Sequence, residues 1–326
     1  MKAVLMDGFG GVEGLKIGEV EKPTPGKGQV LIKTAATSVN RPDIIQRQGN
    51  YPPLKGESKI LGLEVAGIIE AIGPAVQKFD VGERVMALVG GGGYGEFVCA
   101  YENHLIRIPN SMNFREAACI CESYLTAYLN LFLLGKINSR ECVLLHGGGG
   151  GVNTAGIQLC KTLVPQAIVI VTASPSKVSR VKDLGANLVI DYTTEDFSKV
   201  VRSFTNNRGA DVILDHIGGA YLSGNMKSLA AGGRLLSIGV MGGAKAEINL
   251  ALLMVKRQQI IGSVLRSRSI EEKGMIIAKF DQIVLPHLSK RRIVPLIHHT
   301  YPIEEVAEAH RAMEASTHFG KLVLTF

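Results

Sequence analysis

The sequence predicts a two-domain α/β protein, in which a β-rich domain accompanies a doubly wound parallel sheet of six strands. Three observations lead to this fold class. Residues 1 to about 120 hold short apolar runs separated by Gly- and Pro-rich turns, and from Glu141 onward the pattern alternates between strand and helix. Between these two parts, an apolar run leads into five consecutive glycines. The chain has 326 residues, enough to form two separate cores.

The β-rich part is expected to use both ends of the chain. Many short strands joined by turns such as Pro52-Pro53 favour a small barrel. The alternating apolar residues of Lys321 to Phe326 predict a last strand that needs a partner, and the first domain can supply one. We therefore predict a first domain from residues 1–122 and 272–326, and a second from residues 123–271. The expected early strands are Lys2–Met6, Val30–Ala35, Leu61–Ile72, Arg84–Ala87 and Gly95–Ala100.

The stretch from Glu141 to Lys161 predicts a strand, a tight glycine turn and a helix. Such a turn lets the backbone approach a pyrophosphate, which the free N–H groups at the helix start then bind. The expected pyrophosphate loop consists of Gly148, Gly149, Gly150, Gly151 and Val152. Asn153 stands at the third glycine position of the G-x-G-x-x-G pattern, so we expect it to distort or slightly weaken this site.

Strand and helix patterns continue to alternate after the glycine loop, as a doubly wound sheet requires. Further strands are expected at Ala167–Ala173, Leu188–Tyr192, Asp211–Asp215, Arg234–Val240 and Gln259–Leu265. Helices are expected at Pro175–Leu184, Asp196–Asn206, Leu222–Ala231 and Leu250–Arg257, with a long helix after Ser269 and another at Pro302–Ala315.

The end of the second of these strands favours NADPH over NADH. An acidic residue at this place accepts a hydrogen bond from the ribose 2′-OH of NAD, whereas a cation accommodates the 2′-phosphate of NADP. Here the strand runs into Ser174 and Lys177, and no acidic residue follows until Asp183. An ordinary capped helix with solvated cations would give the same pattern, but the missing carboxylate favours NADPH.

Composition excludes several classes of protein. The net charge is +7 from 36 Lys and Arg and 29 Asp and Glu, but the basic residues are dispersed, which makes nucleic acid an unlikely partner. No apolar run reaches the roughly 18 residues that span a bilayer, and the N-terminus does not resemble a secretory signal. The five cysteines lack zinc-site spacing, so we expect reduced thiols in a cytoplasmic protein.

The whole chain resembles the zinc-free quinone oxidoreductases of the medium-chain dehydrogenase/reductase superfamily, the type that includes zeta-crystallin and the p53-inducible enzyme. This resemblance implies a GroES-like catalytic domain and a Rossmann domain. The segments that carry it are Ser38-Val39-Asn40-Arg41, Gln46-Arg47-Gln48-Gly49 with Tyr51, Ile60-Leu61-Gly62-Leu63-Glu64, Glu122 with Leu125-Thr126-Ala127, Ala155-Gly156-Ile157-Gln158-Leu159, Asp215-His216-Ile217-Gly218-Gly219, Leu265-Arg266-Ser267-Arg268 and Gly320-Lys321.

The resemblance also implies roles for individual residues. Those expected to line the nicotinamide pocket, and to take part in catalysis, are Tyr51, Asn40 and Thr126. Those expected to bind other parts of the cofactor, besides the glycine loop, are Lys177, Tyr192, Val240, Met241, Arg266 and Ser267, and the end of the second strand adds Ser174. From residue type alone, Asn40, Tyr51 and Thr126 would be read as a turn, a loop anchor and a helix-capping residue.

The expected enzyme contains no metal. Zinc-dependent relatives carry a Cys where this chain has Asn40, and a Gly-His-Glu where it has Gly62-Leu63-Glu64; Leu cannot ligate zinc and Asn is a poor ligand. Without a Lewis acid, acceptors such as quinones fit best. We therefore expect NADPH-dependent quinone reduction by a homodimer or tetramer. Reduction of the C=C bond of enones, or RNA binding by a protein that retains a nucleotide-binding fold, are the alternatives.

Overall fold

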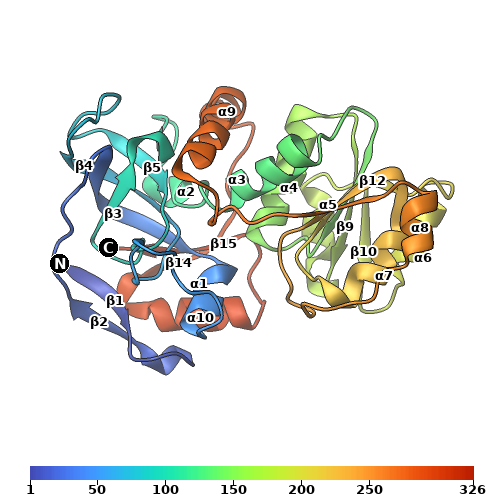
Figure 1. The fold of residues 1–326 in the computed structure, drawn as a ribbon, viewed down its shortest axis with the longest axis horizontal. Coiled ribbons are helices and arrows are strands. Elements are labelled where there is room, and N and C mark those ends of the chain that lie inside the picture. Colours follow the sequence, from blue (N-terminus) through green and yellow to red (C-terminus); the bar gives the residue numbers. More distant parts are fainter. The chain divides into compact units, whose positions relative to one another are not determined.

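The structure is a computed structural model that describes all 326 residues. Its contacts divide the chain into two compact units (Figure 1). Unit 1 consists of Met1–Leu125 and Arg266–Phe326, and unit 2 consists of Thr126–Leu265. Each unit has its own sheet and its own core.

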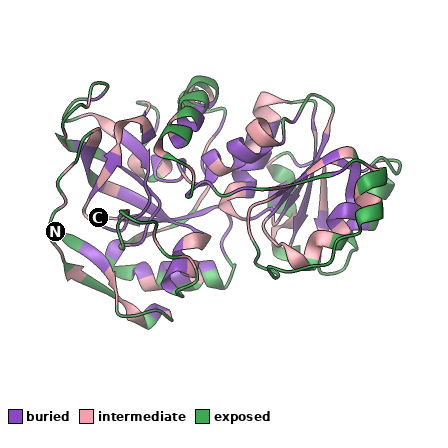
Figure 2. Ribbon diagram, in the orientation of Figure 1, coloured by how far each residue is buried: buried purple, intermediate pink, exposed green.

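Unit 2 contains the predicted six-stranded parallel sheet, in the order β10-β9-β8-β11-β12-β13. The order reverses between β8 and β11, and ligands bind beyond the carboxyl ends of the strands at such a point in doubly wound sheets. The strands are β8 (Cys142–His146), β9 (Ile168–Ala173), β10 (Leu188–Asp191), β11 (Ala210–Asp215), β12 (Leu229–Ser237) and β13 (Gln259–Gly262). Figure 2 shows the buried central strands of this sheet.

Helices connect the strands of unit 2 (Figure 1). They are α4 (Gly151–Leu163), η4 (Pro175–Lys177), α5 (Val178–Asp183), α6 (Phe197–Phe204), α7 (Gly219–Ser228) and α8 (Leu250–Val255), preceded by the π-helical η3 (Leu129–Leu134). The helix that we predicted at Leu222–Ala231 is wrong at its carboxyl end. Leu229 and Ala230 are buried and begin β12, because burial against the sheet outweighs their helix propensity.

Unit 1 is built around a seven-stranded sheet and a separate pair, β1 (Lys2–Met6) with β2 (Leu15–Glu19). The final strand is antiparallel to β3, pairing Leu322 with Val39, so the predicted use of both chain ends in one sheet is confirmed. The larger sheet contains β3 (Gln29–Val39), β4 (Glu64–Ile72), β5 (Arg84–Leu88), β6 (Phe97–Tyr101), β7 (Leu105–Arg107), β14 (Ile297–Pro302) and β15 (Lys321–Thr325).

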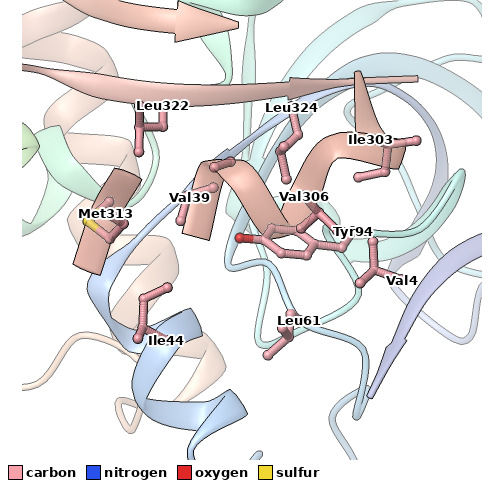
Figure 3. Packing of buried hydrophobic residues seen from close by; sticks show 11 residues of the cluster. Val4, Val39, Ile44, Leu61, Tyr94, Ile303, Val306, Met313, Leu322 and Leu324 are labelled. Atoms are coloured by element: carbon pink, nitrogen blue, oxygen red, sulfur yellow. The ribbon is translucent and has the colours of Figure 1, made fainter. Parts of the chain in front are cut away.

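The helices of unit 1 lie between and beyond these strands. They are η1 (Val12–Gly14), α1 (Arg41–Arg47), η2 (Glu102–His104), α2 (Phe114–Ala117), α9 (Ile270–Ser289), η5 (Ile303–Glu305) and α10 (Val306–Glu314); α3 (Ser123–Tyr128) crosses the division between the units. Figure 3 shows Ile44 of α1, Val306 and Met313 of α10 and Leu322 of β15 in one apolar cluster around Tyr94. This cluster packs α1 against α10 and β15, which lie far from it in the sequence, and so fixes the position of α1.

Candidate active site

The glycine loop follows β8 and precedes α4, as predicted. Gly147 has a φ of +78°, a conformation that favours glycine. A Cβ at Gly148 would lie 2.4 Å from Cγ1 of Val171, and one at Gly149 would lie 2.4 Å from Cδ of Lys177. Since Gly148 leaves no room for a side chain and the loop leads into a helix of 13 residues, the loop offers bare backbone N–H groups to an anion.

A chain of buried hydrogen bonds connects this loop to the interior of unit 2. Gly147 N donates to Oγ1 of Thr172 at 3.1 Å, and that hydroxyl lies 3.1 Å from Nδ1 of His146. His146 Nε2 lies 2.7 Å from Oδ1 of Asn225, whose Nδ2 donates to Asp215 at 3.1 Å. An amide oxygen only accepts, so Nε2 carries the proton and Nδ1 accepts from the Thr172 hydroxyl. Burial lowers the pKa of His146 to about 3, so the chain contains a neutral imidazole.

Asn153 is part of the same support, which revises the effect we expected of it. Its Nδ2 donates to the carbonyl oxygen of Gly147 at 3.0 Å and also to that of His146. The side chain is buried, at 1% exposure, and α4 begins at Gly151 without a break. Where a third glycine would allow closer packing, Asn153 instead fastens the end of β8 to the first turn of α4.

The other cofactor residues predicted in unit 2 gather at the same edge of the sheet. Ser174, Tyr192 and Val240 follow the carboxyl ends of β9, β10 and β12, and the glycine loop follows β8. No carboxylate stands at the end of β9, and the Lys177 side chain lies against Gly149. Tyr192, Val240 and Met241 are about half exposed, as surface groups available to a ligand are. Thr126 also belongs to unit 2, and its carbonyl oxygen accepts from Asn130 at 2.8 Å.

Unit 1 contains Asn40, Tyr51, Arg266 and Ser267, together with a buried charge pair that sequence reasoning missed. Lys321 Nζ lies 3.0 Å from Oε1 of Glu64, and both side chains are at most 5% exposed. Lys321 also donates to Oδ1 of Asn40 at 2.5 Å, while Nδ2 of Asn40 donates to Glu64 at 3.0 Å. Asn40 is thus fixed between an anion and a cation. The Gly320-Lys321 segment was the only signal for this lysine in the sequence.

Glu64 is saturated with donors. Besides Asn40 and Lys321, it accepts from Oγ of Ser38 at 2.5 Å and from the backbone N–H of Glu122 at 2.8 Å. Burial raises the pKa of the neighbouring Glu122 to about 8, and the negative charge of Glu64 adds to this effect. Glu122 therefore holds its proton to a higher pH than a free glutamic acid does, next to a Glu64 carboxylate that four donors stabilise.

A second buried chain connects α10 with the start of α1. Nη1 of Arg47 lies 3.4 Å from Nδ1 of His310, whose Nε2 lies 3.1 Å from the hydroxyl of Tyr94. Because arginine only donates, Nδ1 accepts and Nε2 carries the proton, which leaves the Tyr94 hydroxyl to donate to Asp43 at 3.3 Å. Asp43 in turn accepts from the backbone N–H of Asn40 at 2.8 Å, so this chain orients the residue predicted at the nicotinamide. Burial raises the pKa of Asp43 to about 6.

Tyr51 lies beside Arg266 in unit 1. The Arg266 guanidinium is 5.0 Å from the centroid of the Tyr51 ring, close enough for a cation–π contact. Burial raises the pKa of Tyr51, the charge of Glu122 raises it further, and Arg266 opposes both. The phenol therefore stays protonated at neutral pH and is available as a hydrogen-bond donor.

The five cysteines and the acidic residues form no metal centre. All five cysteines are free thiols, and no group of three or more His, Cys, Asp or Glu side chains is placed to hold a metal ion. Burial raises the pKa of Cys119 and Cys121, so both remain thiols. No helix combines the length and the apolar character that crossing a membrane requires.

Comparison with known families supports the reading of the fold. The model of the alcohol dehydrogenase GroES-like domain matches residues 26–110, and that of the zinc-binding dehydrogenase family matches residues 184–324. The chain belongs to the medium-chain dehydrogenase/reductase superfamily. It is accordingly an oxidoreductase with an NAD(P)-binding dehydrogenase fold.

The relatives within this superfamily differ in their names. The rat quinone oxidoreductase is 32% identical over 99% of this chain and 97% of its own length. The zebrafish synaptic vesicle membrane protein VAT-1 homolog is 31% identical over 99% of this chain and 70% of its own.

Two solved structures similar to this chain also differ in the names they carry. A mycobacterial protein complexed with NADPH is 27% identical with a TM-score of 0.90, and covers 100% of each chain. The JamJ enoyl reductase is 27% identical with a TM-score of 0.89, over 99% of this chain and 98% of its own.

Proposed function

We propose that the protein reduces quinones with NADPH as the hydride donor. The observation that carries the choice of cofactor is the Lys177 side chain against Gly149, with no acidic residue at the end of β9. A cation in that position favours a 2′-phosphate, and no carboxylate repels it. The mycobacterial structural relative with bound NADPH and the rat quinone oxidoreductase support the same reading.

The residues of unit 2 fit the cofactor that this fold implies. Gly148 and Gly149 form a cradle that any Cβ would fill, and the N-terminus of α4 supplies donors for the pyrophosphate. Lys177 and Ser174 would hold the adenosine 2′-phosphate, with Tyr192 beside the ribose. When bound, NADPH supplies the hydride; the protein binds and orients it and excludes water.

The residues at the zinc positions of metal-dependent relatives do not fit a zinc ion, so we propose a metal-free reaction. Leu63 is buried and apolar. The amide oxygen of Asn40 already accepts a hydrogen bond from Lys321, and its amide nitrogen donates one to Glu64. The Lys321 ammonium supplies the positive charge at this place. Quinones suit such an enzyme because they accept hydride without a Lewis acid on the carbonyl.

Tyr51 is the side chain that we assign to the substrate. As hydride reaches the ring, negative charge grows on the quinone oxygen, and a neutral phenol can donate a hydrogen bond to it. Tyr51 is protonated and only partly buried, so it meets both requirements.

The test combines substrates with one matched pair of variants. Lys177→Ala should weaken NADPH binding by about 1–3 kcal/mol, the range for a charge-assisted hydrogen bond, and leave NADH nearly unchanged. Lys182→Ala, an exposed lysine of α5, is the control and should change neither. Equal affinity of the unaltered protein for NADPH and NADH would refute the choice of cofactor. No NADPH consumption with a panel of quinones would refute the substrate class.

A second candidate reaction is reduction of the C=C bond of conjugated enones, which the enoyl reductase among the structural relatives favours. The hydride and the oxygen that gains charge have the same roles in both reactions. Comparing kcat/KM for a quinone panel and an enone panel, at equal NADPH, separates the two.

We also propose that two copies of the chain associate through β13. This strand is at the edge of the unit 2 sheet, and Ile260 and Val264 near it are 39% and 47% exposed. An open apolar edge of this kind promotes uncontrolled pairing unless a twofold copy covers it. Light scattering at micromolar concentration should give at least twice the chain mass of 34.9 kDa, and a mass of one chain would contradict the proposal.

A further inference from the structure

Arg266 is a buried cation whose hydrogen bonding is incomplete. Arg266 is only 6% exposed. Nε and Nη2 both donate to the carbonyl oxygen of Gly90, at 3.1 and 2.6 Å. Nη1 is equally buried and makes no hydrogen bond of normal geometry within the protein, although the guanidinium also interacts with the nearby Tyr51 hydroxyl. A buried donor of a charged group is costly to leave unpaired, so Nη1 calls for an acceptor from outside the chain.

The environment of Arg266 favours an acceptor that carries negative charge. Lys273, a second buried cation at 5% exposure, is close enough that each charge opposes the other: Lys273 has a lowered pKa, mainly through burial and also through Arg266. Glu57 and Glu122 are the carboxyl groups that act on Lys273; Glu122 also faces Arg266, and burial raises its pKa. Two buried cations close to each other favour a ligand atom that carries negative charge.

The backbone around Gly90 holds the guanidinium in place. A Cβ at Gly90 would lie 2.1 Å from the carboxyl carbon of Glu57, so the Glu57 side chain packs against the backbone that Arg266 binds. Two donors of the fork share that single oxygen. The guanidinium carbon lies 5.0 Å from the centre of the Tyr51 ring, and the guanidinium also interacts with the Tyr51 hydroxyl. A rigid donor next to a phenol is the arrangement of a preorganised oxyanion site.

We propose that Arg266 Nη1 and the Tyr51 hydroxyl together bind the substrate oxygen that becomes negatively charged, which makes Arg266 a substrate residue rather than a cofactor residue. This rests on the proposed function. The hydride, with its two electrons, would add to the carbon conjugated with the carbonyl; the C=C π pair would form a new C=C bond to the carbonyl carbon, and the C=O π pair would move onto oxygen, with NADPH oxidised to NADP⁺. The product is an enolate, which in a quinone tautomerises to the phenolate, and the two donors hold the oxyanion until water protonates it.

The pair of donors also defines the substrate class. It requires an unhindered carbonyl oxygen in conjugation with the carbon that takes the hydride, as in a quinone. A simple alkene has no carbonyl oxygen to pair with Nη1. An isolated ketone has one, but the negative charge on its oxygen is not delocalised. Both should therefore be poor substrates.

The experiment measures oxyanion binding directly, without turnover. 4-Nitrophenol serves as the probe, because its phenolate is coloured and the neutral phenol is not. It is titrated with the full-length protein saturated with NADP⁺, near the pH at which the free probe is half ionised. We expect the unaltered protein to bind the phenolate at least about tenfold more tightly than Arg266→Lys does, because lysine keeps the charge but not the geometry of the fork. NADPH affinity should change less than about twofold.

Arg268→Lys is the matched control, since it makes the same exchange two residues away and should bind the probe as the unaltered protein does. Equal phenolate binding by Arg266→Lys and the unaltered protein overturns the proposal. A parallel loss of NADPH affinity also overturns it, because Arg266 then belongs to the cofactor. If the lysine variant does not fold, Arg266→Gln gives the same comparison.

The two proposals fail in different ways. Absence of quinone reduction by the unaltered protein refutes the proposed function, whereas the nitrophenolate titration still decides the role of Arg266.

Discussion

The two units position their functional residues by different physical means. In unit 2, neutral groups fix a bare backbone: the Gly147 N–H, the Thr172 hydroxyl and the His146 imidazole follow one another in a buried chain. In unit 1, opposite charges fix a side chain, as Lys321 and Glu64 hold Asn40 between them. Neutral hydrogen bonds are individually worth about 1 kcal/mol, whereas a broken buried ion pair costs several. Unit 1 should therefore be more sensitive to single substitutions and to pH.

The largest expected effect follows from breaking the ion pair of unit 1. Lys321→Met leaves Glu64 buried and without its cation, and should lower the free energy of unfolding by about 3–5 kcal/mol. Denaturation by urea, followed by far-UV circular dichroism, measures this change. The double variant Glu64→Gln/Lys321→Met should regain most of the loss, because no charge is then left uncompensated.

A substitution in unit 2 gives the stability loss with which that of Lys321→Met can be compared. Thr172→Val removes the hydroxyl from the chain beneath the loop, but Gly147 N retains its bond to the Thr172 carbonyl at 3.0 Å. We expect a loss of about 1 kcal/mol. Equal losses in Lys321→Met and Thr172→Val would show that the two units do not differ in the way their charges suggest.

Above pH 7, the pH dependence of stability should come mainly from unit 1. Glu122 has a pKa raised from 4.5 to about 8, so between these values the folded protein binds more protons than the unfolded chain. Its contribution is therefore complete below pH 4.5 and is lost as the pH rises toward 8, by up to about 1.4 kcal/mol per pH unit. Asp43, with a pKa near 6, acts with the same sign but at lower pH.

Glu122→Gln isolates this contribution. The variant should lose most of the decline in the free energy of unfolding between pH 7 and pH 8, where Asp43, with a pKa of about 6, is already largely ionised. His146 has a pKa of about 3 in the folded protein and 6.5 in the unfolded chain, so it is mostly neutral in both states above pH 7 and contributes little slope there; unit 2 supplies the contrast. A variant with the same slope as the unaltered protein would contradict the assignment.

The difference between the backbone loop of unit 2 and the charged network of unit 1 also explains what could be predicted from the sequence. The glycine loop, the strand before it and the helix after it are contiguous, so local periodicity and turn chemistry predict them. The parallel sheet and the pairing of the last strand with the first domain could also be predicted, since alternating apolar residues need a partner.

The charged network of unit 1 could not be predicted in this way. Glu64 and Lys321 are 257 residues apart, and no local pattern indicates that they touch. Arg47 and His310 are likewise brought together only by the packing of α1 on α10. The short β7 and the glycine-interrupted β2 were missed for a related reason, because their strand character depends on partners rather than on their own residues.

An intermediate effect is expected at Tyr51, where unit 1 is proposed to meet the substrate. Tyr51→Phe removes a donor but no buried charge, and should lower kcat and kcat/KM together by about tenfold to a hundredfold. Water can substitute in part for the phenol, which keeps the loss below that of a fully enclosed oxyanion site. Steady-state kinetics with NADPH and a quinone measure it. Full kcat with an altered KM alone would make Tyr51 a wall of the pocket.

The smallest effect is expected at Asn153, and it tests whether neutral bonds alone position the loop of unit 2. Asn153→Gly restores the third glycine of the dinucleotide pattern but removes the donor to the carbonyl oxygens of His146 and Gly147. If Asn153 weakened the pyrophosphate site, as the sequence pattern alone predicts, this change would keep or tighten cofactor binding. Because the side chain joins β8 to α4, we now expect NADPH affinity to fall about threefold to fivefold, for a loss of roughly 1 kcal/mol. Asn153→Ala is the control for helix propensity, since alanine favours the helix but also lacks the donor. Isothermal titration with NADPH should give similar losses for both variants. Tighter binding by Asn153→Gly would show that the loop needs the close packing of a glycine more than the tether that the asparagine supplies.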